Sequence, residues 1–374
     1  MTTFLECSLL QMSPEAPLKP AQTISLLSDA LQGRDSSHNH VLDVNLDGFS
    51  AKAFIPHGKK IPSSAAPIAC AIGAFDGVHR GHQALIDRLL TRAQELKAAP
   101  LIVTFSPDPA EVLSSVTDGI ELLSVSERIQ LLSTCASVPI IALHFTPELA
   151  QVSYDVFVRD VLQRLGTLRL LVVGENFQMG AKGAGTVSAL SELGAQDGFE
   201  VIGLHLVDDN GSAVSATRIR SLIHVGRVEQ AAGMLGRCYC VEGKIIHGRG
   251  EGKTFGFPTA NVSLSARSCL PKQGVFAGFV VCGSHAWPAA LNVGLPPTFT
   301  DTPATSQAFL EANLLGFSGD LYNRDVTVVF VRWLRDSRPF SSVEELKKVV
   351  LSNIDWVRMT LGEHEVNLGG TNDL

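Results

Sequence analysis

The spacing of apolar residues along this 374-residue chain changes near Gly236. From Ala66 to that point, short apolar runs of strand length alternate with stretches that have helical spacing. Residues 68–73 form one such run, and residues 85–96 then repeat apolar side chains on one helical face. Alternation of this kind predicts a parallel sheet with helices on both faces. Ligands bind at the carboxyl ends of the strands in such sheets.

Beyond Gly236 the chain has short apolar runs separated by Gly, Pro and Asn, with no helical spacing until residues 343–361. This pattern predicts an antiparallel barrel or sandwich followed by a terminal helix. The runs cover residues 241–246, 274–282, 287–293, 308–315 and 326–333.

The length of the chain fits two or three domains. We predict one domain at residues 67–230 and another at 236–362. Residues 1–66 form an N-terminal extension and lead-in of unknown role. Within it, residues 24–31 have helical spacing and residues 42–46 alternate like a strand.

Composition limits the classes of partner. Apolar residues make up 45% and charged residues 18%, which favours packed cores over disorder. The net charge of −7 argues against broad binding to nucleic acid or to anionic membranes. The seven cysteines are scattered, with no C-x-x-C spacing, and neither a convincing signal peptide nor a membrane span is evident. These features favour reduced thiols and a cytoplasmic location.

The first candidate site follows the apolar run 68–73, where the sequence reads GAFDGVHRGH. Its glycines allow the backbone to approach phosphate closely, and a helix starting near Gly81 offers free N–H groups to an anion. His79 and His82 are three residues apart, so both rings can lie on one side of the helix start. These groups suit transfer of a nucleotidyl group from ATP, which requires no nucleophilic side chain. An H-x-G-H alone fits an ordinary helix start at least as well.

A second segment strengthens the phosphate interpretation. The sequence VSATRIR follows the last strand of the alternating region and opens a helix that Ser215 or Thr217 can cap. Arg220 can reach into the same phosphate site, although a solvated arginine is the simpler alternative. Two such motifs at strand-to-helix junctions together favour one site. Asn176, in GENF after another strand, is equally well a site-facing residue or a plain turn residue.

The glycine-rich segment GRGEGKTFGFPTAN marks a candidate site in the second half. Such a loop can wrap phosphates with its N–H groups, or it can be a flexible hairpin. Thr259 and Asn261 alternate, so their oxygens can point the same way and share one Mg²⁺. Glu311 lies inside an apolar strand, where it is either a proton acceptor for a substrate hydroxyl or an outward-facing strand residue.

These motifs resemble those of the bacterial bifunctional riboflavin kinase/FAD synthetase family. Residues 67–225 resemble its adenylyltransferase module through GAFDGVHRGHQALI, TFSPDP, GENFQMG and VSATRIR. Residues 236–360 resemble its riboflavin kinase module through GFPTAN, GVFAGFV, NVGLPPTF and LEANLLGFSGDLYNRDV. The resemblance implies a Rossmann-like parallel-sheet nucleotidyltransferase domain, then an antiparallel β-barrel kinase domain with a terminal helix.

The implied activity is ATP-dependent phosphorylation of riboflavin to FMN, followed by adenylylation of FMN to FAD with release of pyrophosphate. Riboflavin, FMN, FAD and ATP are then the ligands, Mg²⁺ is the cofactor, and a monomer or weak homo-oligomer is expected. Three alternatives stay open: an enzyme with one inactive half, a non-catalytic flavin sensor, and a nucleotidylyltransferase for another substrate. The GFPTAN module argues against the last of these.

The resemblance also implies residue roles. Catalytic roles fall to His79, His82, Asn176, Arg220 and Glu311. Contacts to ATP or phosphate fall to Gly73, Phe75, Asp76, Gly77, Gly81, Ser215, Thr217, Gly248, Gly252, Lys253 and Gly256. Metal ligation falls to Thr259 and Asn261.

The chain departs from the family pattern at several positions to which we assign no bond-making or metal-binding role. We expect these departures to change flavin affinity and rate more than the type of reaction. They include Ser106, Asp108, Met179, Lys253, Pro296 and Asn313. Residues 1–45 exceed the usual family start and carry no recognisable chemistry, so we expect them to be dispensable for both reactions.

Overall fold

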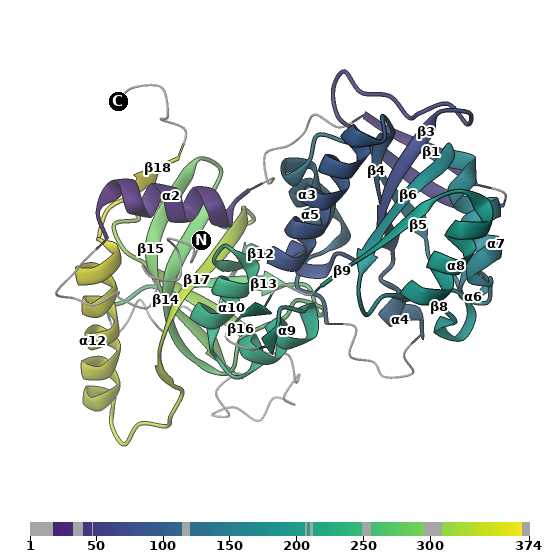
Figure 1. The fold of residues 1–374 in the computed structure, drawn as a ribbon. Helices are drawn as coiled ribbons and strands as arrows, with labels where there is room; N and C mark the ends of the chain where they lie inside the picture. The colour runs from purple at the N-terminus through teal and green to yellow at the C-terminus, as the bar shows by residue number, and fades with distance from the viewer. Residues whose placement is uncertain are drawn as a thin grey trace. The chain divides into compact units, whose positions relative to one another are not determined.

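The computed structural model describes residues 18–32, 40–46, 48–113, 120–205, 208–209, 212–248, 256–294 and 309–368. The chain divides into two compact units (Figure 1). One unit is Gln32–Ser215, and the other combines Met1–Leu31 with Ala216–Leu374. The helices α9 (Ala216–His224) and α10 (Val228–Leu235) therefore belong to the second of these units, which also contains the C-terminal strands.

The first unit is built on a seven-stranded sheet with the order β1-β2-β5-β4-β3-β6-β9. Strands β3, β4, β5, β6 and β9 are parallel, while β1 and β2 form an antiparallel hairpin that pairs with β5. The strand bounds are β1 His40–Leu46, β2 Phe49–Ile55, β3 Pro67–Ile72, β4 Ala99–Ser106, β5 Ile140–His144, β6 Thr167–Gly174 and β9 Glu200–Leu204.

Helices cover both faces of this sheet, which confirms the predicted parallel-sheet architecture. Alternate side chains of β3 enter opposite cores, because successive residues of a strand face opposite sides. One core contains α3 (Arg80–Glu95) and α5 (Val125–Cys135), and the other contains α8 (Val187–Asp197) and the turns of residues 157–165. The shorter elements are η1 Asp76–Val78, α4 Pro109–Leu113, α6 Pro147–Ala150, α7 Tyr154–Val156, η2 Phe157–Val161, η3 Leu162–Leu165, β7 Gln178–Met179, η4 Ala181–Gly183, β8 Gly185–Thr186, β10 Asp208–Asp209 and β11 Ser212–Ala213.

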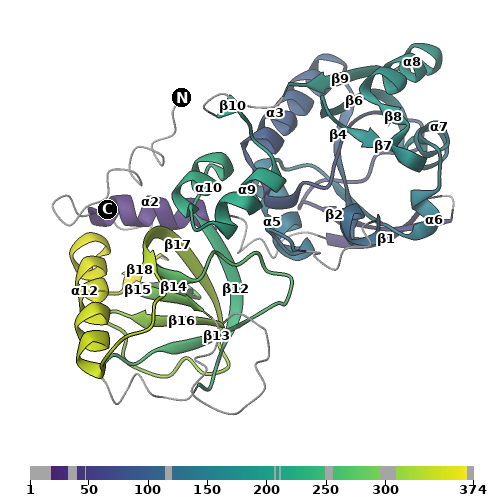
Figure 2. The same cartoon turned by 90° about the horizontal axis from the view of Figure 1, so that it is seen from below.

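The second unit contains a closed six-stranded antiparallel barrel, as predicted (Figure 2). Its strands follow the order β14-β17-β12-β13-β16-β15, and pairing of β14 with β15 closes it. The short β18 extends the sheet beside β15, and a terminal helix, α12, packs on the barrel. The bounds are β12 Tyr239–Ile246, β13 Ala260–Leu264, β14 Gly274–Cys282, β15 His285–Gly294, β16 Phe309–Leu314, β17 Asp325–Asp336, α12 Val343–Leu361 and β18 Val366–Asn367.

The N-terminal helix α2 (Pro20–Ala30) belongs to the barrel core, although about 190 residues of sequence separate it from α9. Figure 1 shows it in purple beside the barrel strands. Leu27 is fully buried in one cluster with Phe279 of β14 and Val357 of α12. The Leu18 amide also donates a hydrogen bond to the Thr360 carbonyl at 2.9 Å. This packing argues against the expectation that residues 1–45 are dispensable, because removal of α2 would expose its buried partners. The effect of their removal on the two reactions stays a prediction.

No helix among the residues with described positions is long and apolar enough to cross a membrane.

Shortening a core side chain of α2 is expected to destabilise the barrel unit. Leu27→Ala removes most of a fully buried side chain, which costs about 2–5 kcal/mol of unfolding free energy. Tryptophan fluorescence reports this unit alone, because Trp287, Trp333 and Trp356 all lie in it. Ser28→Ala, at an exposed position of α2, is the matched control. An unchanged denaturant midpoint for Leu27→Ala would show that α2 does not support the barrel.

Candidate active sites

The loop after β3 is wound tightly at the carboxyl edge of the parallel sheet. Phe75, Gly77 and Val78 have φ values of 57°, 77° and 38°, all in the left-handed region. Glycine adopts such values freely, but a β-branched residue does so only under strain. Phe75 and Val78 are held there by burial, with 1% and 0% of their surface exposed. The loop ends at His79, which is the N-cap residue of α3.

His79 and His82 form a compact pair at that helix start. The Nδ1 atom of His79 accepts the backbone N–H of His82 at 3.4 Å, which caps α3. The two imidazole rings stack with centroids 3.7 Å apart and planes at 16°. A Cβ atom at Gly81 would lie 3.1 Å from the His79 ring, so the glycine leaves room for this stack. The expected placement of both rings on one side of the helix start is thus present.

Asp76, predicted to contact ATP, has a structural role in the described chain. Its buried carboxylate accepts the backbone N–H groups of Leu122, at 3.0 Å, and Leu123, at 3.2 Å. These bonds fix the segment that leads into α5. A contact between Asp76 and ATP stays a prediction.

Arg128 is a residue of this edge that the sequence interpretation missed. Its side chain is 2% exposed, and its guanidinium donates to the carbonyls of Ala74 and Phe105, each at 2.6 Å. Asp108 lies 3.6 Å from the guanidinium. Burial lowers the pKa of Arg128, and the carboxylates of Asp108 and Asp76 oppose that shift. Arg128 thereby joins the loop after β3, the end of β4 and the helix α5.

One sequence signal pointed to Arg128. It precedes Ile129, Leu131 and Leu132, which are buried residues of the same short helix. A charged residue on an apolar helical face needs a buried partner. Asp108, one of the departures from the family pattern, is thus an acid placed beside a buried cation.

Two further predicted segments lie at the same edge of the sheet. Asn176 is exposed in the turn that follows β6 directly. Strand β6 pairs in parallel with β3, with Ala71 opposite Val172, so the loops after the two strands start side by side. The Val214 carbonyl lies 3.8 Å from the position of a Gly81 Cβ, which brings the segment ending at Ser215 to the helix start.

Thr217 and Arg220 lie on α9, in the unit that contains the barrel. The Arg220 guanidinium is 3.5 Å from the Thr217 hydroxyl, as expected for residues three apart on a helix. The predicted meeting of Arg220 with His82 would join the two units and stays a prediction.

In the barrel, Glu311 and Asn261 are direct cross-strand partners. Their strands, β16 and β13, are neighbours in the sheet (Figure 2). Side chains in such antiparallel pairs have Cβ atoms about 4.5–5.5 Å apart. Asn292 of β15 faces Glu311 from the other side and was missed by the sequence interpretation. Glu311 is half-buried and alternates with the buried Leu310 and Ala312, so it points away from their face.

Two contacts fix the strand that carries Asn261. A Cβ atom at Gly248 would lie 1.9 Å from the Asn261 amide nitrogen, so only glycine leaves this space open. The Asn313 amide donates to the Pro258 carbonyl at 2.8 Å. This bond ties β16 to the residue before Thr259, so Asn313 supports the predicted metal ligands.

The remaining predicted residues of this site are only partly described. Gly256 has a φ of 89°, a conformation that favours glycine. Gly252, Lys253 and Pro296 lie outside the described residues. Within the described part of the chain, no group of three or more His, Cys, Asp or Glu residues is placed to hold a metal ion.

Replacing Arg128 with methionine is expected to loosen the carboxyl edge of the sheet. The change removes the donor to the Phe105 carbonyl, one of two donors to the Ala74 carbonyl and the cation beside Asp108. Breaking a buried pair costs roughly 3–5 kcal/mol. We expect faster amide hydrogen exchange in residues 73–82 and 120–128. Arg88→Met, on the exposed face of α3, is the control. Exchange at the wild-type rate in both segments would contradict this role for Arg128.

Comparisons with known proteins agree with the division into two halves. The sequence model of the FAD synthetase family matches residues 61–218, and that of the riboflavin kinase family matches residues 235–361. The bifunctional riboflavin kinase/FMN adenylyltransferase of Pseudomonas fluorescens is 34% identical over 76% of this chain and 89% of its own length. The protein of that name from Escherichia coli K12 is 31% identical over 74% of this chain and 87% of its own length.

A solved structure has a similar fold over most of the chain. It is the macrolide-efflux protein from Streptococcus pneumoniae, with 26% identity and a TM-score of 0.69. The similarity covers 80% of this chain and 96% of that one. Fold, motifs and sequence identity agree: the chain belongs to the family of bacterial bifunctional riboflavin kinase/FMN adenylyltransferases.

Proposed function

We propose that this chain phosphorylates riboflavin to FMN and adenylylates FMN to FAD, using ATP for both reactions. The observation that carries the proposal is that each unit holds its own set of reactive groups. The first has the His79–His82 pair at a helix start, and the second has the Asn261–Glu311 cross-strand pair. An enzyme with one inactive half would have no reason to keep both sets.

The adenylyl transfer is assigned to the carboxyl edge of the sheet. A phosphate oxygen of FMN attacks the α-phosphorus of ATP, and the bond to the bridging oxygen breaks as pyrophosphate leaves with its electron pair. The protein has to neutralise charge and hold the two phosphates in line. His79, His82 and the first N–H groups of α3 supply the donors. Asn176 and Ser215 border the same loop.

The triphosphate is assigned partly to backbone groups. Anion-binding loops commonly contain left-handed residues, and the positive φ values of Phe75 and Gly77 support placing the triphosphate at this loop. Gly73 and Gly81 have no side chain, so a phosphate can approach the backbone closely at both positions. Thr217 and Arg220 complete the set, and this part of the proposal requires α9 to reach the loop.

The kinase reaction is assigned to the barrel face at β13 and β16. Glu311 accepts the proton of the terminal ribityl hydroxyl, whose oxygen attacks the γ-phosphorus of ATP. The bond from the γ-phosphorus to the β–γ bridging oxygen breaks, and ADP leaves with its electron pair. Gly248, Gly252, Lys253 and Gly256 belong to the loop that covers the phosphates.

Mg²⁺ is the cation that this barrel face would hold. The Thr259 hydroxyl, the Asn261 amide oxygen and the Glu311 carboxylate are all hard oxygen donors, which Mg²⁺ prefers. Thr259 and Asn261 would hold the ion, which offsets phosphate charge when bound. The Asn261 amide packs closely against the Gly248 backbone, and this defined position supports the assignment.

The net charge and the buried thiols support a proposal for the cellular location and the partners of the enzyme. Burial raises the pKa of the Cys70 thiol to about 12 and also raises that of the Cys238 thiol. Buried thiols of this kind are unreactive and suit a reducing cytoplasm. We also propose a monomer or weak homo-oligomer with no nucleic-acid or membrane partner, in line with the net charge of −7.

The purified chain is expected to convert riboflavin first to FMN and then to FAD. With excess ATP and Mg²⁺, chromatography should show FMN rising before FAD. FMN without FAD would restrict the activity to the kinase half. Flavin binding without either product would identify a sensor.

The two activities are expected to be separable by substitution, because His82 and Glu311 lie in different units. Glu311→Gln keeps the side-chain size and removes the base, so FMN formation should fall about 10²–10⁴-fold. His82→Ala removes a phosphate donor, a loss worth roughly 2.7–4 kcal/mol in the adenylyl transfer. Each half-reaction is assayed alone, starting from riboflavin or from FMN.

The controls for this experiment are exposed residues of the same types. Glu344→Gln on α12 and His364→Ala should leave both half-reactions at wild-type rates. Circular dichroism checks that each variant is folded. If either active-site substitution lowered both half-reactions equally in a folded protein, two independent sites would be ruled out.

A further inference from the structure

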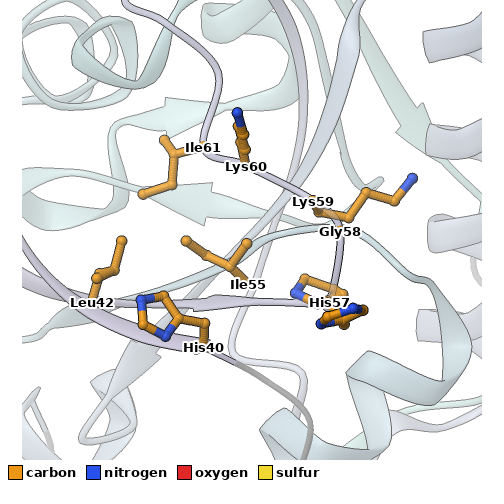
Figure 3. A pocket seen from close by; sticks show the side chains of 9 residues that line it. His40, Leu42, Ile55, His57, Gly58, Lys59, Lys60 and Ile61 are labelled. Carbon is orange, nitrogen blue, oxygen red and sulfur yellow. The ribbon is translucent and has the colours of Figure 1, made fainter.

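A pocket of about 300 Å³ opens beside the β1–β2 hairpin of the first unit (Figure 3). His40 and Leu42 come from β1, Ile55 comes from β2, and residues 56–61 follow β2 directly. All nine residues that line the pocket have described positions. None of its lining residues is assigned to the two reactions described above.

The pocket combines an apolar floor with a cationic rim. Ile55 is buried and Ile61 packs against the same core. In Figure 3, Leu42 and these two isoleucines surround one space. Lys59 and Lys60 belong to the segment that borders it, and their ammonium ends point outward in different directions. No carboxylate is among the lining residues, so an anion at the rim meets no opposing charge.

The register of the sheet places this pocket at the edge opposite the adenylyl site. Phe54 of β2 pairs with Ile140, the first residue of β5, whereas the loops of the adenylyl site follow the carboxyl ends of the parallel strands. The first and last residues of β5 mark the two edges, and the four residue steps between them span ~13 Å. The FAD synthetase match begins at residue 61, so every other lining residue precedes it.

We propose that this pocket is a second, non-catalytic binding site for a phosphate-bearing ring compound of mononucleotide size. The volume is near the lower limit for small-molecule sites, which fits one ring system against Leu42, Ile55 and Ile61. The exposed side chains of Lys59 and Lys60 then turn toward the ligand, and a phosphate gains charge-assisted hydrogen bonds from them. FMN and adenine nucleotides both have this chemistry, so the site would respond to a substrate or product of the chain itself.

The test uses the full chain with ¹³C-labelled isoleucine methyl groups, because Ile55 and Ile61 report on the pocket and not on the catalytic edge. Ile55→Val and Ile61→Val assign the two signals. FMN and AMP are titrated separately, which distinguishes a flavin from an adenine ligand. We expect at least one of them to shift both methyl signals in a saturable way. Riboflavin, which lacks the phosphate, and pyrophosphate, which lacks the ring, should bind at least tenfold more weakly.

The charge contribution is tested with Lys59→Gln/Lys60→Gln, which should raise the dissociation constant at the pocket about five- to tenfold. Lys52→Gln, exposed on β2 but outside the pocket, should leave it unchanged. The proposal is overturned if neither FMN nor AMP moves the two methyl signals at millimolar concentration. It is also overturned if pyrophosphate binds as tightly as they do, or if the double variant binds like wild type.

Discussion

The buried guanidinium of Arg128 is the interaction on which the carboxyl edge of the sheet depends. A charge removed from water costs several kcal/mol unless its environment replaces the lost hydration. Here the carbonyls of Ala74 and Phe105 and the carboxylate of Asp108 do so. Ala74 directly precedes the strained turn that leads to His79, and its carbonyl also accepts the Thr104 hydroxyl at 3.1 Å. The network that stabilises this edge therefore also positions the phosphate-binding loop.

The barrel site is positioned by packing and register instead of a buried charge. Glu311 faces Asn261 on one neighbouring strand and Asn292 on the other, so the positions of three strands decide which side chains meet. A shift of one residue would turn Glu311 to the opposite face. Gly248 adds a steric constraint, because any larger residue would displace the Asn261 amide.

Sequence patterns predicted the features that depend on local periodicity. The strand–helix alternation, the barrel strands and the shared face of His79 and His82 all follow from spacing alone. The position of α2 could not be predicted in this way, because its apolar face fits any nearby core equally well. Asp76 illustrates a second limit: its position in a glycine-rich motif suggested ATP, but its carboxylate holds two amides from a segment 46 residues away. Long-range hydrogen bonds leave no periodic signal.

The unit that contains the barrel is built from both ends of the chain, although the two reactions do not require this arrangement. The barrel core contains α2, which precedes the parallel-sheet unit in the sequence, and strands that follow that unit. A kinase fragment that began at Ala216 would expose the apolar residues that Leu26, Leu27 and Ala30 cover. Exposed core surface of this kind lowers stability and favours aggregation. The barrel therefore completes its core only when both segments of the chain are present, whatever the state of the adenylyl site.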